Sequence, residues 1–173
     1  MLWGKDKKRA EKPSFYSIKP SDFAGLEARI KSKNTVLLIH ATWCMHCVMF
    51  TPKYSAFAKT VKSTKRNVQV LALESTVMKT LHETDKKLFA FVTGFKGGDM
   101  YFPKVMTFKV TGDRIVRKEY QGDRTEKDLL AFTDKNLVAA APVVKAAPVA
   151  RKAMATMNEQ LMGAPHQRRQ QQS

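Results

Sequence analysis

Two cysteines separated by two residues are the part of this chain best suited to chemistry. Cys44 and Cys47 are its only cysteines, and they lie between an apolar run at 35–40 and an amphipathic run at 48–61. These runs predict a buried strand followed by a helix. Thiols three positions apart at such a junction can close a disulfide across one helical turn, and the helix N-terminus favours a thiolate at the first. The pattern therefore indicates a dithiol/disulfide redox centre.

Other interpretations of the cysteine pair fit the sequence less well. A zinc site needs about four ligands, whereas the histidines outside the motif, His40, His82 and His166, are scattered. A structural disulfide over so short a loop would constrain little of the unfolded chain. Inert buried thiols would need neither the flanking Trp43 nor the intervening His46. We therefore predict a redox site with neither a metal nor a cofactor.

The charge of the chain is strongly positive. Its 173 residues include 31 Lys and Arg against 15 Asp and Glu, a formal net charge of +16. Such a charge predicts attraction to an anionic partner: nucleic acid, an anionic lipid surface or an acidic protein. Sequence-specific nucleic-acid binding is not expected, because the sequence has no basic patch with interleaved aromatic residues and no reader motif. It also lacks the apolar run of about 18 residues that a membrane span needs.

The N-terminal residues and the cysteine pair together indicate the compartment in which the protein is expected to act. Residues 1–9 are too polar for a secretory signal peptide. A Cys-x-x-Cys pair without an export signal is typical of a redox motif in a reducing compartment. We therefore expect a cytoplasmic protein, or one that is carried within a virion or another large particle.

Hydrophobic periodicity predicts alternating strands and helices from about residue 15 to residue 137. Strands are expected at 15–18, 35–40 and 68–73, a hairpin at 105–110 and 114–118, and helices from 20, over 48–61 with a kink at Pro52, over 77–92 and from 125. This order predicts an α/β three-layer sandwich in which a mixed central sheet is flanked by helices.

The composition divides the chain into three parts. Residues 1–13 form a basic N-terminal arm, residues 14–138 the α/β domain, and residues 139–173 an Ala/Pro-rich basic tail. The tail lacks a sustained apolar period, so we expect it to be extended or disordered unless bound. It could be a solubilising extension, contact nucleic acid non-specifically, or dock into a multi-subunit assembly.

Several features together resemble the thioredoxin superfamily between about residues 15 and 137. They are Trp43 with the cysteine pair after a strand, Pro52 five residues beyond the second cysteine, the hairpin, and the segment 102–108, which is similar to the family segment that opens with a cis-proline. The resemblance implies a thioredoxin-like sandwich with extended basic termini. It also implies a thiol–disulfide oxidoreductase that acts on protein dithiols and disulfides. The alternative is a structural component of a large assembly, for example a minor capsid or virion protein, that keeps this fold and binds neighbouring subunits through its arms.

The resemblance also implies roles for individual residues. Cys44 would be the exposed nucleophile, Cys47 the buried resolving thiol, and Pro103 the cis-proline that packs against the disulfide. Trp43 and His46 would support the site. A histidine between the cysteines resembles the oxidase and isomerase branches of the family. Its imidazolium would stabilise the nearby Cys44 thiolate, which favours the reduced protein and so raises the reduction potential. A solvated histidine without a redox role is the alternative.

Some positions depart from the family pattern. Leu38 stands where thioredoxin has a buried acid that assists proton transfer, and His40 on the same strand is a candidate to take part of that role. Met45 is larger than the usual small residue between the cysteines, and Phe102 and Lys104 are bulkier than usual beside the proline. We expect these differences to reduce efficiency as a reductase and to narrow the substrate groove or change what it accepts.

Overall fold

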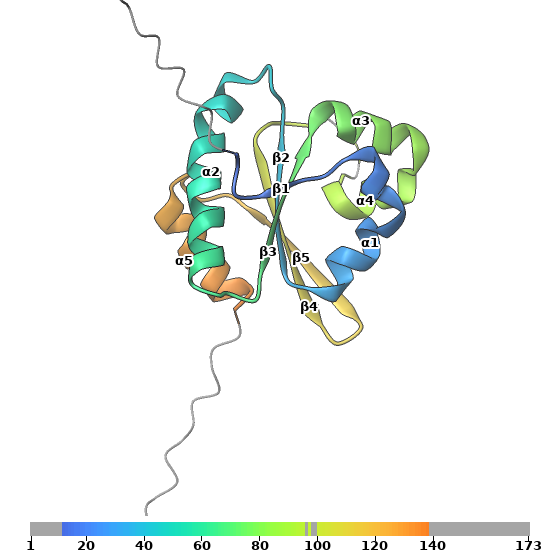
Figure 1. Cartoon of the computed structure of the whole chain (residues 1–173). Coiled ribbons are helices and arrows are strands. Elements are labelled where there is room, and N and C mark those ends of the chain that lie inside the picture. Colours follow the sequence, from blue (N-terminus) through green and yellow to red (C-terminus); the bar gives the residue numbers. More distant parts are fainter. Residues whose placement is uncertain (1–11, 96, 98–99, 139–173) are drawn as a thin grey trace, which may run out of the picture. The chain divides into compact units, whose positions relative to one another are not determined.

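The computed structural model describes residues 12–95, 97 and 100–138. They form a five-stranded sheet in the order β1-β3-β2-β4-β5, with helices on both faces (Figure 1). The strands are Tyr16–Ser17 (β1), Thr35–His40 (β2), Gln69–Glu74 (β3), Lys104–Thr111 (β4) and Arg114–Tyr120 (β5). The helices are the 3-10 turn Pro20–Asp22 (η1), Phe23–Ser32 (α1), Met45–Ser63 (α2), Ser75–Thr84 (α3), Lys86–Thr93 (α4) and Glu126–Asn136 (α5). The predicted α/β sandwich with a mixed sheet is confirmed.

β2 lies at the centre of the sheet, parallel to β3 and antiparallel to β4. Its last residue, His40, lies opposite Glu74, the last residue of β3. β4 and β5 form the predicted hairpin, in which Gly112 takes the left-handed backbone conformation (φ +56°) that glycine adopts readily. The parallel strands β2 and β3 therefore end at the same edge of the sheet, and the chain leaves β2 toward the cysteine motif at that edge.

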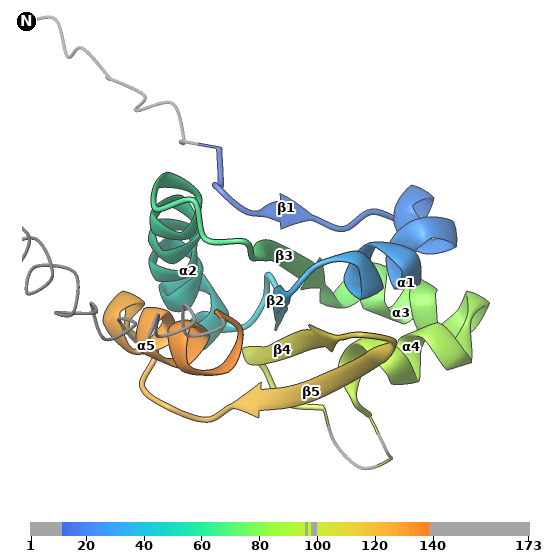
Figure 2. The ribbon, with the colours of Figure 1, turned by 90° about the horizontal axis from the view of Figure 1, so that it is seen from below.

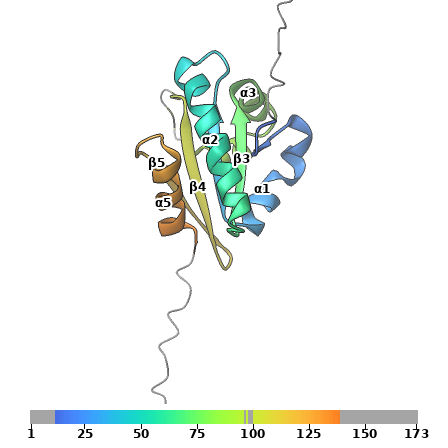
Figure 3. The same ribbon diagram turned by 60° about the vertical axis from the view of Figure 1, so that its left-hand side comes forward.

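Two helical layers cover the sheet, with α2 and α5 on one face and α1, α3 and α4 on the other (Figures 1, 2 and 3). Side chains alternate between the two faces along a strand. Val36 and Leu38 of β2 accordingly pack in the core beside α2 and α5, whereas Leu37 and Ile39 pack in the core beside α1, α3 and α4. The near-continuous apolar run at 35–40 is thus that of a central strand buried on both faces.

The single helix expected over 77–92 is wrong, because the segment forms α3 and α4 with a break at Asp85. The backbone of Asp85 leaves helical geometry (φ −147°, ψ 89°), and its carboxylate accepts a hydrogen bond from the Leu88 N–H at 2.9 Å. Asp85 is therefore the N-cap of α4, while its own N–H donates to the Leu81 carbonyl at the end of α3. The apolar spacing is helical on both sides of the break, so periodicity alone does not reveal it.

Helix α2 is longer than predicted. It begins at Met45 and ends at Ser63, whereas the amphipathic run indicated 48–61. Pro52 lies inside the helix, and the kink expected there stays a prediction. The earlier start makes Cys44 the N-cap residue, so the helix begins directly at the cysteine motif.

The ends of the domain are tied to its core. The Ser14 N–H donates to Ser55 Oγ of α2 at 3.0 Å, and Val138 packs against the same core in which Leu137 is buried. The tail expected at 139–173 and most of the arm expected at 1–13 lie outside the described residues, so these limits stay predictions. Within the described part of the chain, no helix is long and apolar enough to cross a membrane.

Candidate active site

The two cysteines lie at the start of α2, just beyond the C-terminal end of β2. Cys44 has extended backbone (φ −86°, ψ 114°), and its carbonyl accepts a hydrogen bond from the Val48 N–H at 3.0 Å. Its N–H donates to the Ala41 carbonyl at 3.2 Å. Cys47 follows in the first turn of the helix. Because the core holds both β2 and α2, this short connection fixes the dithiol at the edge of the sheet.

The two thiols have different surroundings. Cys44 is half-buried, whereas Cys47 is only 1% exposed. The Sγ of Cys47 accepts a hydrogen bond from the Ala41 N–H at 3.4 Å. The Cys44 thiol donates weakly to the Phe102 carbonyl, with 3.7 Å between Sγ and oxygen. Both cysteines are free.

The helix start lowers the pKa of Cys44. The Cys47 N–H contributes most, and the Cys47 thiol, the His46 N–H and the positive charge of Arg124 act in the same direction against burial. Burial raises the pKa of Cys47 to about 11, with the neighbouring Cys44 adding to this effect and the Ala41 N–H opposing it. The thiolate is the nucleophilic form. The more exposed thiol is therefore also the more acidic one, which is the order that the implied roles require.

The segment before β4 lies beside Cys44. The Phe102–Pro103 peptide bond is cis, as the resemblance implies, and Pro103 is buried. The rings of Trp43 and Phe102 meet edge-on, with centroids 5.8 Å apart and planes at 88°. Through this ring contact and its carbonyl, Phe102 joins the cis-proline segment to the dithiol.

Arg124 is a site residue that sequence reasoning missed. It lies between β5 and α5, and its charge lowers the pKa of both Cys44 and Cys47. A basic residue in a loop carries no local signal, and only the packing of α5 beside α2 brings it near the thiols. His46 is exposed and acts on Cys44 through its backbone N–H. The redox role expected for the His46 imidazole stays a prediction.

The positions below the dithiol differ from the family pattern as expected. Leu38, which stands where thioredoxin has its buried acid, is fully buried in the core beside α2. This position therefore supplies no carboxylate to the dithiol. His40 is half-buried, and burial lowers its pKa while Glu74 opposes this. Burial works against ionisation of Glu74, but hydrogen bonds from Thr76 and Ser75 lower its pKa to about 2. Among the described residues no hydrogen bond joins His40 to either thiol, and its part in proton transfer stays a prediction.

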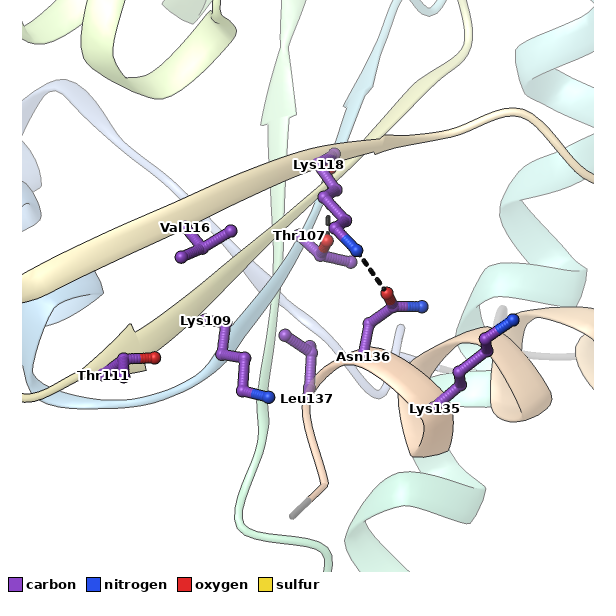
Figure 4. Close-up of a pocket in the computed structure, with 8 residues that line it drawn as sticks. All are labelled: Thr107, Lys109, Thr111, Val116, Lys118, Lys135, Asn136 and Leu137. Carbon is purple, nitrogen blue, oxygen red and sulfur yellow. Dashed lines mark hydrogen bonds between the residues drawn. The ribbon is translucent and has the colours of Figure 1, made fainter. Parts of the chain in front are cut away.

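A cavity of about 290 Å³ lies at the other end of the sheet, between the β4–β5 hairpin and the C-terminal end of α5 (Figure 4). Its lining residues are Thr107, Lys109, Thr111, Val116, Lys118, Lys135, Asn136 and Leu137. Lys118 Nζ donates to Asn136 Oδ1 at 3.1 Å, and cations balance the partial negative charge of a helix C-terminus. The helix end thus accounts for Lys118 and for Lys135 in the last turn of α5. In residues 12–95, 97 and 100–138, no three His, Cys, Asp or Glu side chains are placed to hold a metal ion.

The match to a known family covers the dithiol and more than half of the domain. Residues 17–91 match the family model Thioredoxin. Together with the sheet order, the cysteine pair at the start of α2 and the cis-proline before β4, this match shows that the chain carries a domain of the thioredoxin superfamily. The expected fold is therefore confirmed.

The relatives carry the names of protein disulfide-isomerases or isomerase-like proteins. The chain is 30% identical over 106 residues to a protein named as a protein disulfide-isomerase in Schizosaccharomyces pombe, covering 61% of this chain and 18% of that one. It is 31% identical over 104 residues to Protein disulfide isomerase-like 1-1 of Arabidopsis thaliana, covering 60% and 18%. The solution structure of the first thioredoxin domain of mouse Protein disulfide-isomerase A4 is 20% identical with a TM-score of 0.51, covering 87% of this chain and 96% of that one, and it shares the fold. The chain matches under a fifth of the length of these two curated relatives, and the names of these proteins give no support to the capsid or virion alternative.

Proposed function

We propose that the domain is a thiol–disulfide oxidoreductase whose working groups are Cys44 and Cys47. The observation that carries the proposal is the asymmetry of the two thiols. Cys44 is partly exposed and acidic at the start of α2, whereas Cys47 is buried with its pKa raised to about 11. The likeness to protein disulfide-isomerases supports thiol–disulfide exchange as the class of reaction.

In the direction of reduction, the Cys44 thiolate attacks one sulfur of a protein disulfide. A bond forms between Cys44 Sγ and that sulfur, the substrate S–S bond breaks, and the other sulfur leaves as a thiolate that takes a proton from water. Cys47 then loses its proton and attacks Cys44 Sγ. The mixed disulfide breaks, the substrate leaves fully reduced, and the two electrons it gained come from the dithiol, which is now a disulfide.

The same steps in reverse oxidise a protein dithiol, so the reduction potential decides the direction. Members of this family range from about −270 mV to about −120 mV. We expect a value between these limits, because the helix start and Arg124 stabilise the thiolate at Cys44. We also propose that the protein works in a reducing compartment. The reduction potential of the Cys44–Cys47 pair would show whether the pair is a reductant or an oxidant there.

The experiment combines a redox titration with trapping variants. The wild-type chain should equilibrate with glutathione between a dithiol and a disulfide form and should reduce insulin in the presence of a dithiol. Cys47→Ser should accumulate a mixed disulfide with substrate, because no resolving thiol remains. Cys44→Ser should form none, because Cys47 is buried. Equal trapping by both variants would contradict the assigned roles, and no reaction with any disulfide would contradict the function.

A further inference from the structure

Large apolar side chains gather on the surface around the dithiol. Trp43, Met45 and Met49 are 74%, 69% and 65% exposed, and Val48 and Tyr101 are more than half exposed. None of these five belongs to either core cluster, so the stability of the fold does not account for them. An exposed apolar surface of this kind marks a place where another molecule binds.

Two shallow hollows continue this surface on either side of Arg124. One has a volume of about 220 Å³ and is bordered by Tyr101 and Pro103. The other has a volume of about 140 Å³ and is bordered by Met49 and Lys53. Arg124 lines both of them. The apolar side chains on α2 and those before β4 are therefore parts of one face, with a cation between them.

This face carries the cations Lys53, Lys104 and Arg124, while Asp123 and Asp128 act on Tyr120 at the border of the first hollow. Lys104 pairs with Glu119 at 3.1 Å. In the part of the chain that the structure describes, however, no ion pair joins Lys53 or Arg124 to a carboxylate. The hollow that these two cations share has no acidic residue in its lining. Cations beside an exposed apolar surface are complementary to a partner that carries carboxylates next to apolar side chains.

The spacing along α2 defines the partner more closely. Met45, Met49 and Lys53 are four residues apart and so lie along one line of the helix surface. At a rise of about 1.5 Å per residue, Lys53 is about 13 Å along the helix from Cys44, a length that about four residues of extended peptide cover. Methionine side chains adapt to apolar groups of varied shape.

We propose that this face selects protein substrates whose cysteine has an apolar neighbour and an Asp or Glu about four positions away. The apolar side chain would rest on Met45 and Met49, and the carboxylate would reach Lys53 and Arg124. This inference rests on the proposed function, because the substrate must first form a mixed disulfide with Cys44. Beyond the proposed function, the inference specifies which cysteines of a partner protein react fastest with Cys44.

The test uses the full chain carrying Cys47→Ser and three peptides of equal length, each activated as a mixed disulfide with 2-mercaptoethanol. The first peptide has Leu on both sides of its cysteine and Glu four positions away on both sides. The second has Ser in place of Leu, and the third has Lys in place of Glu. The first peptide should form the mixed disulfide with Cys44 at least about three times as fast as the second or the third peptide. The expected ratio is small because exposed ion pairs contribute little free energy. Its advantage over the lysine peptide should shrink as salt is added.

Matched variants locate the effect. Lys53→Glu should reverse the preference between the Glu and Lys peptides, and Met49→Ser should reduce the preference for Leu. Lys87→Glu, an exposed lysine at the start of α4, should leave both preferences unchanged. The neutral 2-hydroxyethyl disulfide separates the two claims. If the wild-type chain does not react with it, the proposed function is wrong. If it reacts but the three peptides have equal rates, or Lys87→Glu acts as strongly as Lys53→Glu, the proposed selectivity is wrong.

Discussion

The second step of the proposed reaction should depend steeply on pH, because Cys47 must lose a proton before it attacks. With its pKa raised from 9.0 to about 11, a fraction of about 10⁻⁴ is thiolate at pH 7, since each pH unit below the pKa costs a factor of ten. Part of the raised pKa comes from Cys44, whose charge disappears in the mixed disulfide, but burial is the larger cause and persists. With Leu38 in place of an acid, no carboxylate at that position takes the proton. Resolution should therefore rise about tenfold per pH unit from pH 7 to beyond pH 9.

The assay is a single turnover of the wild-type chain with excess activated peptide, quenched with acid at intervals and analysed by intact mass. Formation of the mixed disulfide should level off at a lower pH than its decay, because the Cys44 pKa is lowered and that of Cys47 is raised. Cys47→Ser provides the control, since its mixed disulfide should persist at every pH. A decay rate that becomes constant at or below pH 8.5 would refute the reasoning and indicate a group that lowers the Cys47 pKa in the intermediate.

Four further predictions concern single features of the domain. Arg124→Gln should move the Cys44 thiolate titration, followed by absorbance at 240 nm, to higher pH, because a positive charge that lowers its pKa is lost; an unchanged midpoint would remove Arg124 from the site. Glu74→Gln should destabilise the domain by about 1 kcal/mol at pH 7 in urea unfolding, since the carboxylate caps α3. The Glu74 pKa is lowered from 4.5 to about 2, so this difference should be complete above pH 4.5 and should disappear as pH falls toward 2; a constant difference would show that charge is not involved. Tyr54→Phe should lower the free energy of unfolding by about 1–2 kcal/mol and leave thiol exchange unchanged, because the one proton of the buried hydroxyl is shared between carbonyls of β2 and β3 at 3.1 and 2.9 Å; a variant as stable as wild type would show that this bond contributes little. A chain that ends at Val138 should keep its thermal unfolding midpoint and its exchange activity but elute earlier from an anionic column, and loss of stability would place the domain boundary further along the chain.

Most of the fold could be predicted from local sequence patterns. The strand at 35–40 has the predicted bounds, because its near-continuous apolar run supplies side chains to both cores. The hairpin and α5 also follow their turn and capping residues, with Gly112 in the turn and Thr125 as the N-cap that accepts from the Asp128 N–H. The prediction failed at 77–92, where the Asp85 cap interrupts a helical period that continues on both sides, and it made α2 too short. Capping is a local hydrogen-bonding event, and it outweighed the periodic signal.

The motifs behind the proposed chemistry can be read in the sequence: two thiols at a spacing and a position that suit reversible disulfide formation, and a proline before a later strand that resembles the family's cis-proline. Both follow from residues that are neighbours in the chain. The surroundings of the two thiols, in contrast, depend on how distant segments of the chain pack together. Three features depend on residues that are distant in sequence. They are the burial that raises the pKa of Cys47, the charge of Arg124 near the thiols, and the apolar face that includes Met49 and Tyr101. Desolvation and Coulomb interactions depend on distance in space, which no local pattern of residues encodes.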